Sequence, residues 1–273
     1  MVSSRTSGPS LVNSVLELRA GVEACLLPGS YPLLLLAERG EQRPVMLIPG
    51  FTSSDHSTYF IRQYLRRQGY DVYGWEQGAN VGLIAAVFAS LEQRLDDIYQ
   101  RTGRPVSLVG WSLGGFYVRA LANKHPDKVR SIVTIATTFS LPTPRAVNRV
   151  ITRLYGYLNP SQQSDEFFIS SDMWEATPPL PATSIYSEGD GVNNWRYCLD
   201  KESPRAENIR VYGSHCGLTV NPMVYYLVAN RLAQDPADWQ PFSSAQALST
   251  CRARLLNDAR AAVTAWLPRR ARV

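Results

Sequence analysis

The fold of this chain is decided by one stretch, Val106-Ser107-Leu108-Val109-Gly110-Trp111-Ser112-Leu113-Gly114-Gly115. It begins as a short apolar strand, passes through the pattern Gly-x-Ser-x-Gly, and leads into helical spacing over residues 116–124. This order predicts a nucleophile elbow, a sharp strand-to-helix turn that exposes the Ser112 hydroxyl at the edge of a parallel sheet. Gly110 and Gly114 fit this interpretation because neighbouring backbone passes close to so tight a turn. The alternative is a glycine-rich turn with a surface serine.

From residue 44 onward, short apolar runs alternate with amphipathic stretches. The expected strands cover residues 44–50, 71–75, 106–110, 129–138, 182–187 and 207–212. The expected helices cover residues 56–67, 83–99, 113–124, 218–232 and 246–266. This alternation predicts an α/β fold with a mostly parallel sheet and helices on both faces. The chemistry of such folds lies at the carboxyl ends of the strands.

Composition narrows the class of protein and its partners. The 273 residues, 45% of them hydrophobic, suffice for one sizeable domain. The formal net charge is +5, and six arginines crowd residues 252–272. We find neither a basic stripe interleaved with aromatic residues nor a zinc-finger spacing, so nucleic acid is not an expected partner.

The four cysteines are Cys25, Cys198, Cys216 and Cys251. None forms a Cys-x-x-Cys pair, so neither a redox motif nor a structural zinc site is predicted, and buried thiols are expected. Cys198 and Cys216 each follow a predicted site loop, which leaves a disulfide between them as an alternative.

The N-terminal region lacks a secretory pattern and any stretch long enough to span a bilayer. We therefore expect a cytoplasmic protein without stable membrane insertion. Residues 1–10 read as a disordered tail. Apolar positions in 11–27 recur at helical spacing and predict a helix ending at Pro28-Gly29, which covers the domain flank or contributes to a substrate entrance. An early strand is expected over 33–37.

Between residues 139 and 181 the alternation stops, and prolines and aromatic residues take its place. We interpret this segment as an inserted lid or cap. The candidate substrate-pocket residues are Trp111, Leu154, Tyr155, Phe167 and Trp174, joined by Tyr157, Leu158 and Phe168 as further apolar residues of the insertion. The alternative is that the insertion forms a small core of its own.

The C-terminal helix over 246–266 carries one apolar face and several arginines. We expect it to pack on the domain or on a second subunit, and contact with an anionic membrane is the alternative. The predicted division of the chain is 1–43, a tail and helix; 44–234, the α/β domain; and 235–273, a helical extension.

A serine nucleophile needs a base, and the chain has only three histidines. His215 directly follows the last predicted strand, at the edge where Ser112 lies. His125 ends the helix after the elbow, at the opposite edge, and His56 begins a helix. We therefore predict His215 as the base, against the alternative of a hydrogen-bonded loop histidine.

The base in turn needs a carboxylate that holds its tautomer. Asp190 follows the preceding strand in a Gly-Asp-Gly loop, whereas the competitors Asp172 and Asp200 stand in less regular contexts. We predict Asp190; the alternative role is that of a turn aspartate. The chain order is then serine, aspartate, histidine.

Two backbone N–H groups are the candidate oxyanion hole, which stabilises negative charge developing on a carbonyl oxygen. One belongs to Leu113, directly after the serine. The other belongs to Phe51, in the loop that follows the strand over 44–50, provided that this loop lies beside the elbow. The alternative for Phe51 is a plain strand-to-helix loop.

At this point the chain resembles the α/β-hydrolase fold superfamily, in particular its bacterial esterase and lipase-like group. The resemblance covers about Val45 to Leu232 and rests on Ile48-Pro49-Gly50-Phe51, Gly110–Gly115, Gly189-Asp190-Gly191 and Gly213-Ser214-His215-Cys216-Gly217. Two departures stand out. Pro49-Gly50 replaces the His-Gly of many relatives, and Asn193-Asn194 stands where relatives often have Val-Pro.

The resemblance implies hydrolysis of a small-molecule carboxylic ester through Ser112, His215 and Asp190, with an acyl-enzyme intermediate and an apolar acyl group. It implies no metal and no organic cofactor. Two alternatives remain, an acyltransferase on the same triad and a non-catalytic binding protein that uses the same fold.

Overall fold

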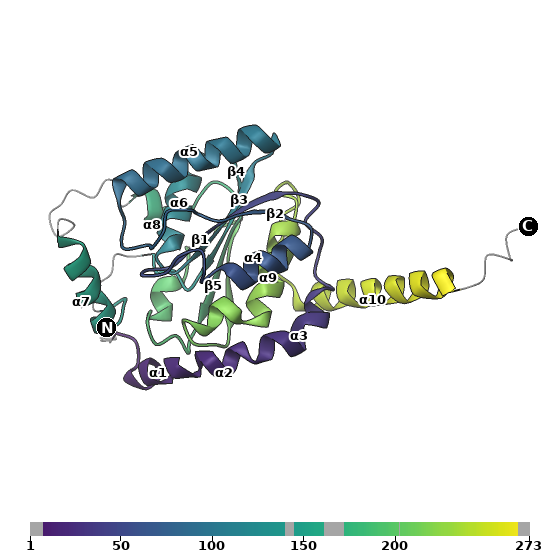
Figure 1. Cartoon of the computed structure of the whole chain (residues 1–273), viewed down its shortest axis with the longest axis horizontal. Helices are drawn as coiled ribbons and strands as arrows, with labels where there is room; N and C mark the ends of the chain where they lie inside the picture. Colours follow the sequence, from purple (N-terminus) through teal and green to yellow (C-terminus); the bar gives the residue numbers. More distant parts are fainter. Residues whose placement is uncertain (1–7, 140–144, 161–171, 202, 267–273) are drawn as a thin grey trace, which may run out of the picture.

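The computed structural model describes residues 8–139, 145–160, 172–201 and 203–266, with the side chains of all of these except residues 172 and 257–266. The described residues form six strands, all paired in parallel in the order β2-β1-β3-β4-β5-β6 (Figure 1). Their bounds are β1 Pro44–Ile48, β2 Asp71–Tyr73, β3 Val106–Trp111, β4 Val129–Ile135, β5 Ala182–Ser187 and β6 Ala206–Val211. The predicted parallel sheet is confirmed.

Helices cover both faces of the sheet, as predicted. They are α1 Leu11–Leu16, α2 Ala20–Ala24, α3 Leu26–Leu34, α4 Tyr59–Arg67, α5 Ala85–Thr102, α6 Gly114–Lys124, α7 Arg149–Leu158, α8 Asp172–Glu175, α9 Pro222–Ala233 and α10 Ser244–Trp266. Short 3-10 helices cover Glu17–Arg19 (η1), Trp195–Cys198 (η3) and Gly217–Val220 (η4).

Two apolar cores lie on opposite faces of the sheet. In β1, where all five residues are buried, Met46 and Ile48 join the core under α5 and α6, while Val45 and Leu47 join the core under α4 and α9. This division follows from the two-residue period of a strand, and a strand buried on both faces therefore reads as a continuous apolar run.

The expected strand over 33–37 is wrong, and so is the expected helix end at Pro28-Gly29. Helix α3 continues to Leu34 and is followed by a turn. Pro28 lies in the first turn of α3, where a missing N–H removes no intrahelical hydrogen bond. The Leu34 carbonyl accepts hydrogen bonds from Tyr64 of α4 and from Gln68, the residue that caps α4, at 3.1 and 2.6 Å, so packing against α4 takes the place of sheet pairing.

The predicted insertion contributes α7 and α8, and its Phe167 and Phe168 lie outside the described residues. Arg119 of α6 forms a buried ion pair of 2.6 Å with Asp200, which lies beyond this segment in the chain. Arg119 also donates to the carbonyls of Trp174 and Ala176, at 2.5 and 2.7 Å. One buried guanidinium therefore ties α8 to the helix that follows the elbow.

The alternative of a Cys198–Cys216 disulfide is wrong. All four cysteines are free; Cys198 is buried in η3, whereas Cys216 is exposed at the start of η4. The carbonyl of Cys198 accepts a 2.6 Å hydrogen bond from Ser184 of β5, which keeps that residue under the sheet.

The first and last described helices lie at the periphery of the sheet domain. Helices α1 to α3 run along one edge of the molecule, beside α9, and α10 extends away from it (Figure 1). None of the described helices is both long and apolar enough to cross a membrane.

Candidate active site

Ser112 lies at the end of β3 on a strained turn. Its φ is +53°, in the left-handed region that L-residues rarely adopt. A Cβ on Gly110 would lie 2.6 Å from Cα of Gly115, and one on Gly114 would lie 2.3 Å from the carbonyl oxygen of Ile48. Glycine is therefore required at both positions for the turn to close against α6 and β1, and the predicted strand–turn–helix geometry is present.

His215 and Asp190 meet at the same edge of the sheet. His215 follows β6 and Asp190 follows β5, and the distance from Nδ1 to Oδ2 is 2.7 Å. The other oxygen of Asp190 accepts the backbone N–H groups of Val192 and Asn193, at 2.8 and 2.7 Å. Both side chains of the pair are almost fully buried, and the carboxylate orients the imidazole.

The surroundings of His215 alter its pKa in two directions. Burial alone lowers the pKa, but the charge and hydrogen bond of Asp190, with a smaller contribution from Glu17, outweigh burial and raise it. The protonated imidazole is therefore stabilised, as a base that accepts a proton during a reaction requires.

Ser112 and His215 share the neighbour Trp111, whose ring centroid lies 5.5 Å from that of His215. Among the described residues, the Ser112 hydroxyl makes no hydrogen bond with the imidazole. Such bonds are often long in the absence of substrate.

Phe51 and Leu113 line the same small pocket as Ser112. Strand β1 pairs with β3, and a Cβ added at Gly50 would lie 3.1 Å from Cβ of Ser112, so the loop after β1 lies beside the elbow. Within the described part of the chain, the backbone N–H groups of Phe51 and Leu113 donate no hydrogen bond. Two unpaired donors therefore belong to residues that border the serine.

The loop after β1 is supported by Asn80, which we did not predict. The buried Asn80 amide donates to the Pro49 carbonyl at 2.8 Å, and the Asn80 carbonyl accepts the Thr52 N–H at 2.7 Å. This support comes from the loop after β2 and reaches the loop on both sides of Gly50.

The pocket at Ser112 is narrow and mostly apolar. Its remaining lining residues are Phe116, Thr138, Val147, Ile151, Tyr155, Val192 and Asn193. Its free volume is about 30 Å³, room for about two water molecules. Helix α7 closes one side of this pocket.

The predicted pocket residues are distributed over several places. Tyr155 lines the pocket and packs against Phe51, with ring centroids 5.3 Å apart. Leu154, on the same helix, is 38% exposed, and Trp174 lies in the core against Phe116 rather than in the pocket lining. Trp111 stands on the other side of the elbow, near His215.

Comparisons with known proteins agree with this geometry. A family profile described as the α/β-hydrolase fold matches residues 85–194, which include Ser112 and Asp190. This chain has the α/β-hydrolase fold.

Solved structures with a TM-score above 0.5 have the same fold at low sequence identity. A chain from LipS and LipT, two metagenome-derived lipolytic enzymes, matches with a TM-score of 0.51 and 17% identity, over 71% of this chain and 93% of that one. The monoacylglycerol lipase of Paleococcus ferrophilus matches with a TM-score of 0.51 and 14% identity, over 72% and 96%. Lipase B of Aspergillus fumigatus matches with a TM-score of 0.49 and 17% identity, over 73% of this chain but 55% of that one. A search of curated proteins found no match.

The other histidines of this α/β-hydrolase-fold protein have different partners. His125 contacts Glu92 at 2.6 Å, at the end of α6, and the exposed His56 contacts Ser54 at 3.1 Å. Asp200, one competitor of Asp190, is occupied by the buried Arg119.

The N-terminal helices contribute a residue to the site that sequence reasoning missed. The Glu17 carboxylate accepts the backbone N–H groups of Gly191 and His215, both at 2.8 Å, and of Cys216 at 3.2 Å. One carboxylate therefore joins the loop of Asp190 to the loop of His215. Glu23 adds a second connection, because it accepts the Ser214 hydroxyl at 2.7 Å.

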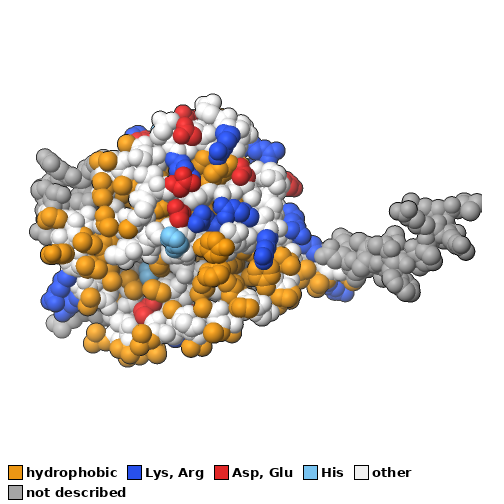
Figure 2. Space-filling view, viewed as in Figure 1, with side chains coloured by type: hydrophobic (Ala, Val, Ile, Leu, Met, Phe, Trp, Pro, Cys, Tyr) orange, Lys and Arg blue, Asp and Glu red, His pale blue; other side chains and the backbone are white. Residues whose placement is uncertain are grey.

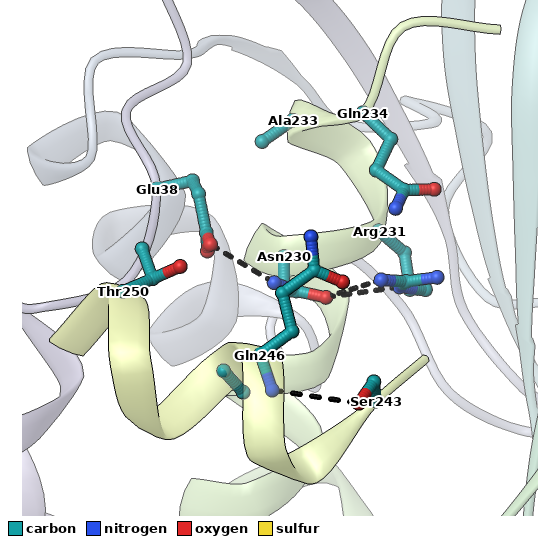
Figure 3. A pocket seen from close by; sticks show the side chains of 9 residues that line it. Glu38, Asn230, Arg231, Ala233, Gln234, Ser243, Gln246 and Thr250 are labelled. Atoms are coloured by element: carbon teal, nitrogen blue, oxygen red, sulfur yellow. Dashed lines mark hydrogen bonds between the residues drawn. The ribbon is translucent and has the colours of Figure 1, made fainter. Parts of the chain in front are cut away.

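A second hollow of the hydrolase-fold protein lies between α9 and the start of α10 (Figure 3). Its polar side chains bond to one another: Asn230 donates to Glu38 at 3.0 Å and accepts from Arg231 at 2.6 Å (Figure 3). These contacts join α9 to the segment that follows α3. In the described part of the chain, no cluster of three or more metal-ligating side chains occurs.

Proposed function

We propose that this α/β-hydrolase-fold protein cleaves carboxylic esters, with Ser112 as nucleophile, His215 as base and Asp190 as the residue that orients the base. The observation that carries the proposal is the combination at one sheet edge of a serine on a strained elbow with a buried His–Asp pair of 2.7 Å. A serine with ordinary backbone geometry, or a histidine without a carboxylate, would lack the activation that a hydroxyl nucleophile needs.

In the first half of the reaction, Ser112 Oγ attacks the ester carbonyl carbon while His215 accepts the hydroxyl proton. The carbonyl oxygen becomes negatively charged, and the N–H groups of Phe51 and Leu113 stabilise it. The carbon–oxygen bond to the alcohol then breaks, and the alcohol leaves with the proton from the imidazolium. An acyl group remains bound to the serine.

In the second half, water replaces the alcohol. His215 accepts a proton from the water as its oxygen attacks the acyl carbon, and the bond to Ser112 breaks with return of the proton to the serine oxygen. Asp190 holds the imidazole tautomer in both halves. An acceptor alcohol in place of water makes the same machinery an acyltransferase.

The substrate class follows from the pocket lining. Most lining side chains are apolar, among them Phe116, Val147 and Ile151, which favours an apolar acyl group. Helix α7 supplies Ile151 and Tyr155 to this lining, so its side chains contact the bound acyl group. The lipolytic enzymes of the same fold make esters of graded chain length the first substrates to test.

The decisive experiment is labelling with a fluorophosphonate probe, which reacts with activated serines. We expect the wild type to be labelled and Ser112→Ala to be unlabelled, while Ser90→Ala, at an exposed serine of α5, is labelled like the wild type. A series of p-nitrophenyl esters from acetyl to palmitoyl then measures the acyl preference.

Three results would contradict the proposal or change its class. A folded wild type that neither labels nor cleaves any ester overturns the hydrolase proposal in favour of a binding protein. Labelling that persists in Ser112→Ala assigns the nucleophile to another residue. Formation of a new ester on addition of an acceptor alcohol, faster than release of free acid, identifies an acyltransferase.

A further inference from the structure

The N-terminal helical segment, residues 11–36, has an inverted polarity. An ordinary surface helix turns its apolar face to the protein and its polar face to water. Here the most exposed side chains are apolar: Leu11, Val12, Val15, Leu18, Val22, Leu26 and Leu33, with Leu18 at 87% and Leu11 at 84% exposure. We call residues 11–36 the strap, and this row of exposed apolar side chains its apolar face.

The charged residues of the strap face the protein instead. They are Glu17, Arg19 and Glu23. Glu17 accepts N–H groups from both site loops, and Arg19 pairs with Glu23 at 2.8 Å and donates to the Gly189 carbonyl at 2.9 Å. Asn13 likewise donates to the Glu188 carbonyl at 3.0 Å. The polar face is therefore fixed inward by specific bonds, and the apolar face is left outward.

The apolar face continues toward α7. A hollow lined by Leu11, Val12 and Val15 of the strap also includes Val150 of α7, and Asn148 donates to Ser14 at 2.8 Å across the junction. Figure 2 shows hydrophobic side chains gathered along the edge of the molecule where α1 and α2 run.

Helix α7 adds positive charge at this end of the apolar face. Arg149 and Arg153 are exposed, and Arg149 lines the hollow shared with the strap. Tyr157, on the same helix, is also exposed. An uncharged apolar row beside exposed arginines matches the boundary between acyl chains and anionic headgroups.

We propose that the apolar face of the strap lies on a lipid bilayer, with Arg149 and Arg153 beside anionic headgroups. Its helices over residues 11–34 are together about 36 Å long at about 1.5 Å per residue, and the strap lies in the plane of the interface without spanning it.

The position of the strap gives this contact a consequence for the site. The face opposite the bilayer holds the loops of Asp190 and His215, so adsorption brings the candidate active site to a lipid surface. This consequence rests on the proposed ester hydrolysis, whereas membrane binding itself is independent of catalysis.

The test measures sedimentation of the full chain with lipid vesicles. Because this assay requires no catalysis, a negative result is distinguishable from a negative result in the esterase assay. Vesicles of phosphatidylcholine are compared with vesicles in which a third of the lipid is phosphatidylglycerol. The test variant replaces Leu18, Val22 and Leu26 by glutamine, which keeps helix propensity. The matched control replaces the three exposed leucines of α10, Leu248, Leu255 and Leu256, by glutamine.

We expect the wild type and the α10 control to bind the anionic vesicles, and the strap variant to bind more than about a hundredfold more weakly. Arg149→Gln and Arg153→Gln each reduce binding to anionic vesicles about fivefold and leave binding to neutral vesicles unchanged. Circular dichroism verifies that each variant is folded.

Three outcomes would overturn the proposal. One is a wild type that sediments with neither kind of vesicle, and another is a strap variant that binds like the wild type. Loss of binding in the α10 control alone would assign the membrane contact to α10. Self-association of the wild type without vesicle binding, abolished in the strap variant by analytical ultracentrifugation, would assign the apolar face to a second copy of the chain.

Discussion

The substitution Glu17→Gln tests whether the N-terminal strap positions the candidate catalytic groups. Glu17 accepts N–H groups of Gly191, His215 and Cys216, at 2.8, 2.8 and 3.2 Å. Glutamine keeps the length of the side chain but removes the charge and turns one acceptor into a donor, which then faces the backbone donors of the site loops.

The magnitude follows from the bonds that are lost. A hydrogen bond to a charged group contributes about 1.5–3 kcal/mol. Glu17→Gln removes at least one such bond to the loops of Asp190 and His215, so this is the smallest free-energy loss that we expect. Because about 1.4 kcal/mol corresponds to a tenfold change in rate, kcat/KM falls about 10- to 100-fold if the loss appears in the transition state. The negative charge of Glu17 also raises the pKa of His215, after the larger effects of burial and of Asp190. Its removal therefore moves the acidic limb of the rate profile to lower pH.

The assay is kcat/KM for a soluble p-nitrophenyl ester across the pH range, with thermal unfolding measured in parallel. The matched control is Glu76→Gln, since Glu76 is exposed and pairs with Arg94 of α5 rather than with a loop of the candidate site. A Glu17→Gln enzyme with the rate and pH profile of the wild type refutes the positioning role. If the rate falls but the pH midpoint is unchanged, Glu17 positions the site loops without raising the pKa of His215.

Three further predictions concern stability and pH. Gly114→Ala places a Cβ 2.3 Å from a carbonyl oxygen of β1, so we expect it to lower the free energy of unfolding by about 3 kcal/mol. The control Gly21→Ala has open space around it and raises the free energy of unfolding by up to about 1 kcal/mol. Urea unfolding measures both changes. Arg119→Met leaves Asp200 buried without its partner and costs about 3–5 kcal/mol, part of which the added change Asp200→Asn restores in a double-mutant cycle. Burial lowers the pKa of His215 but the neighbouring carboxylates raise it, so kcat/KM rises with pH through a midpoint above about 6.5. Protonation of His215 also stabilises the fold, and this contribution to the free energy of unfolding has the opposite trend. It is complete below about pH 6.5 and is lost as the pH rises through the raised pKa of His215. Unfolding measured across the pH range tests this.

The sequence alone was sufficient to predict the sheet and the elbow, because each requires a recognisable pattern of neighbouring residues. A strand buried on both faces must be apolar throughout, as β1 is, and a turn that approaches α6 and β1 closely must carry glycine at 110 and 114. The predicted pairing of Asp190 with His215 followed from position alone. Parallel strands end at one edge, so residues directly after β5 and β6 come together there.

The tertiary structure was needed for the groups that hold these residues in place. Glu17 meets His215 across 198 positions and Gly191 across 174, and its partners are backbone N–H groups. A contact of this kind leaves no periodicity and no characteristic spacing in the sequence. The same holds for Asn80, which supports the loop after β1 from the loop after β2.

The orientation of the strap is the clearest case. Helical periodicity over residues 11–27 divides the segment into an apolar and a polar face, and the usual expectation buries the apolar one. Which face meets the protein depends on the surface that receives it. Here that surface is a pair of loops with free backbone N–H and carbonyl groups, so the charged side chains turn inward to bond them, and the leucines and valines are left outside.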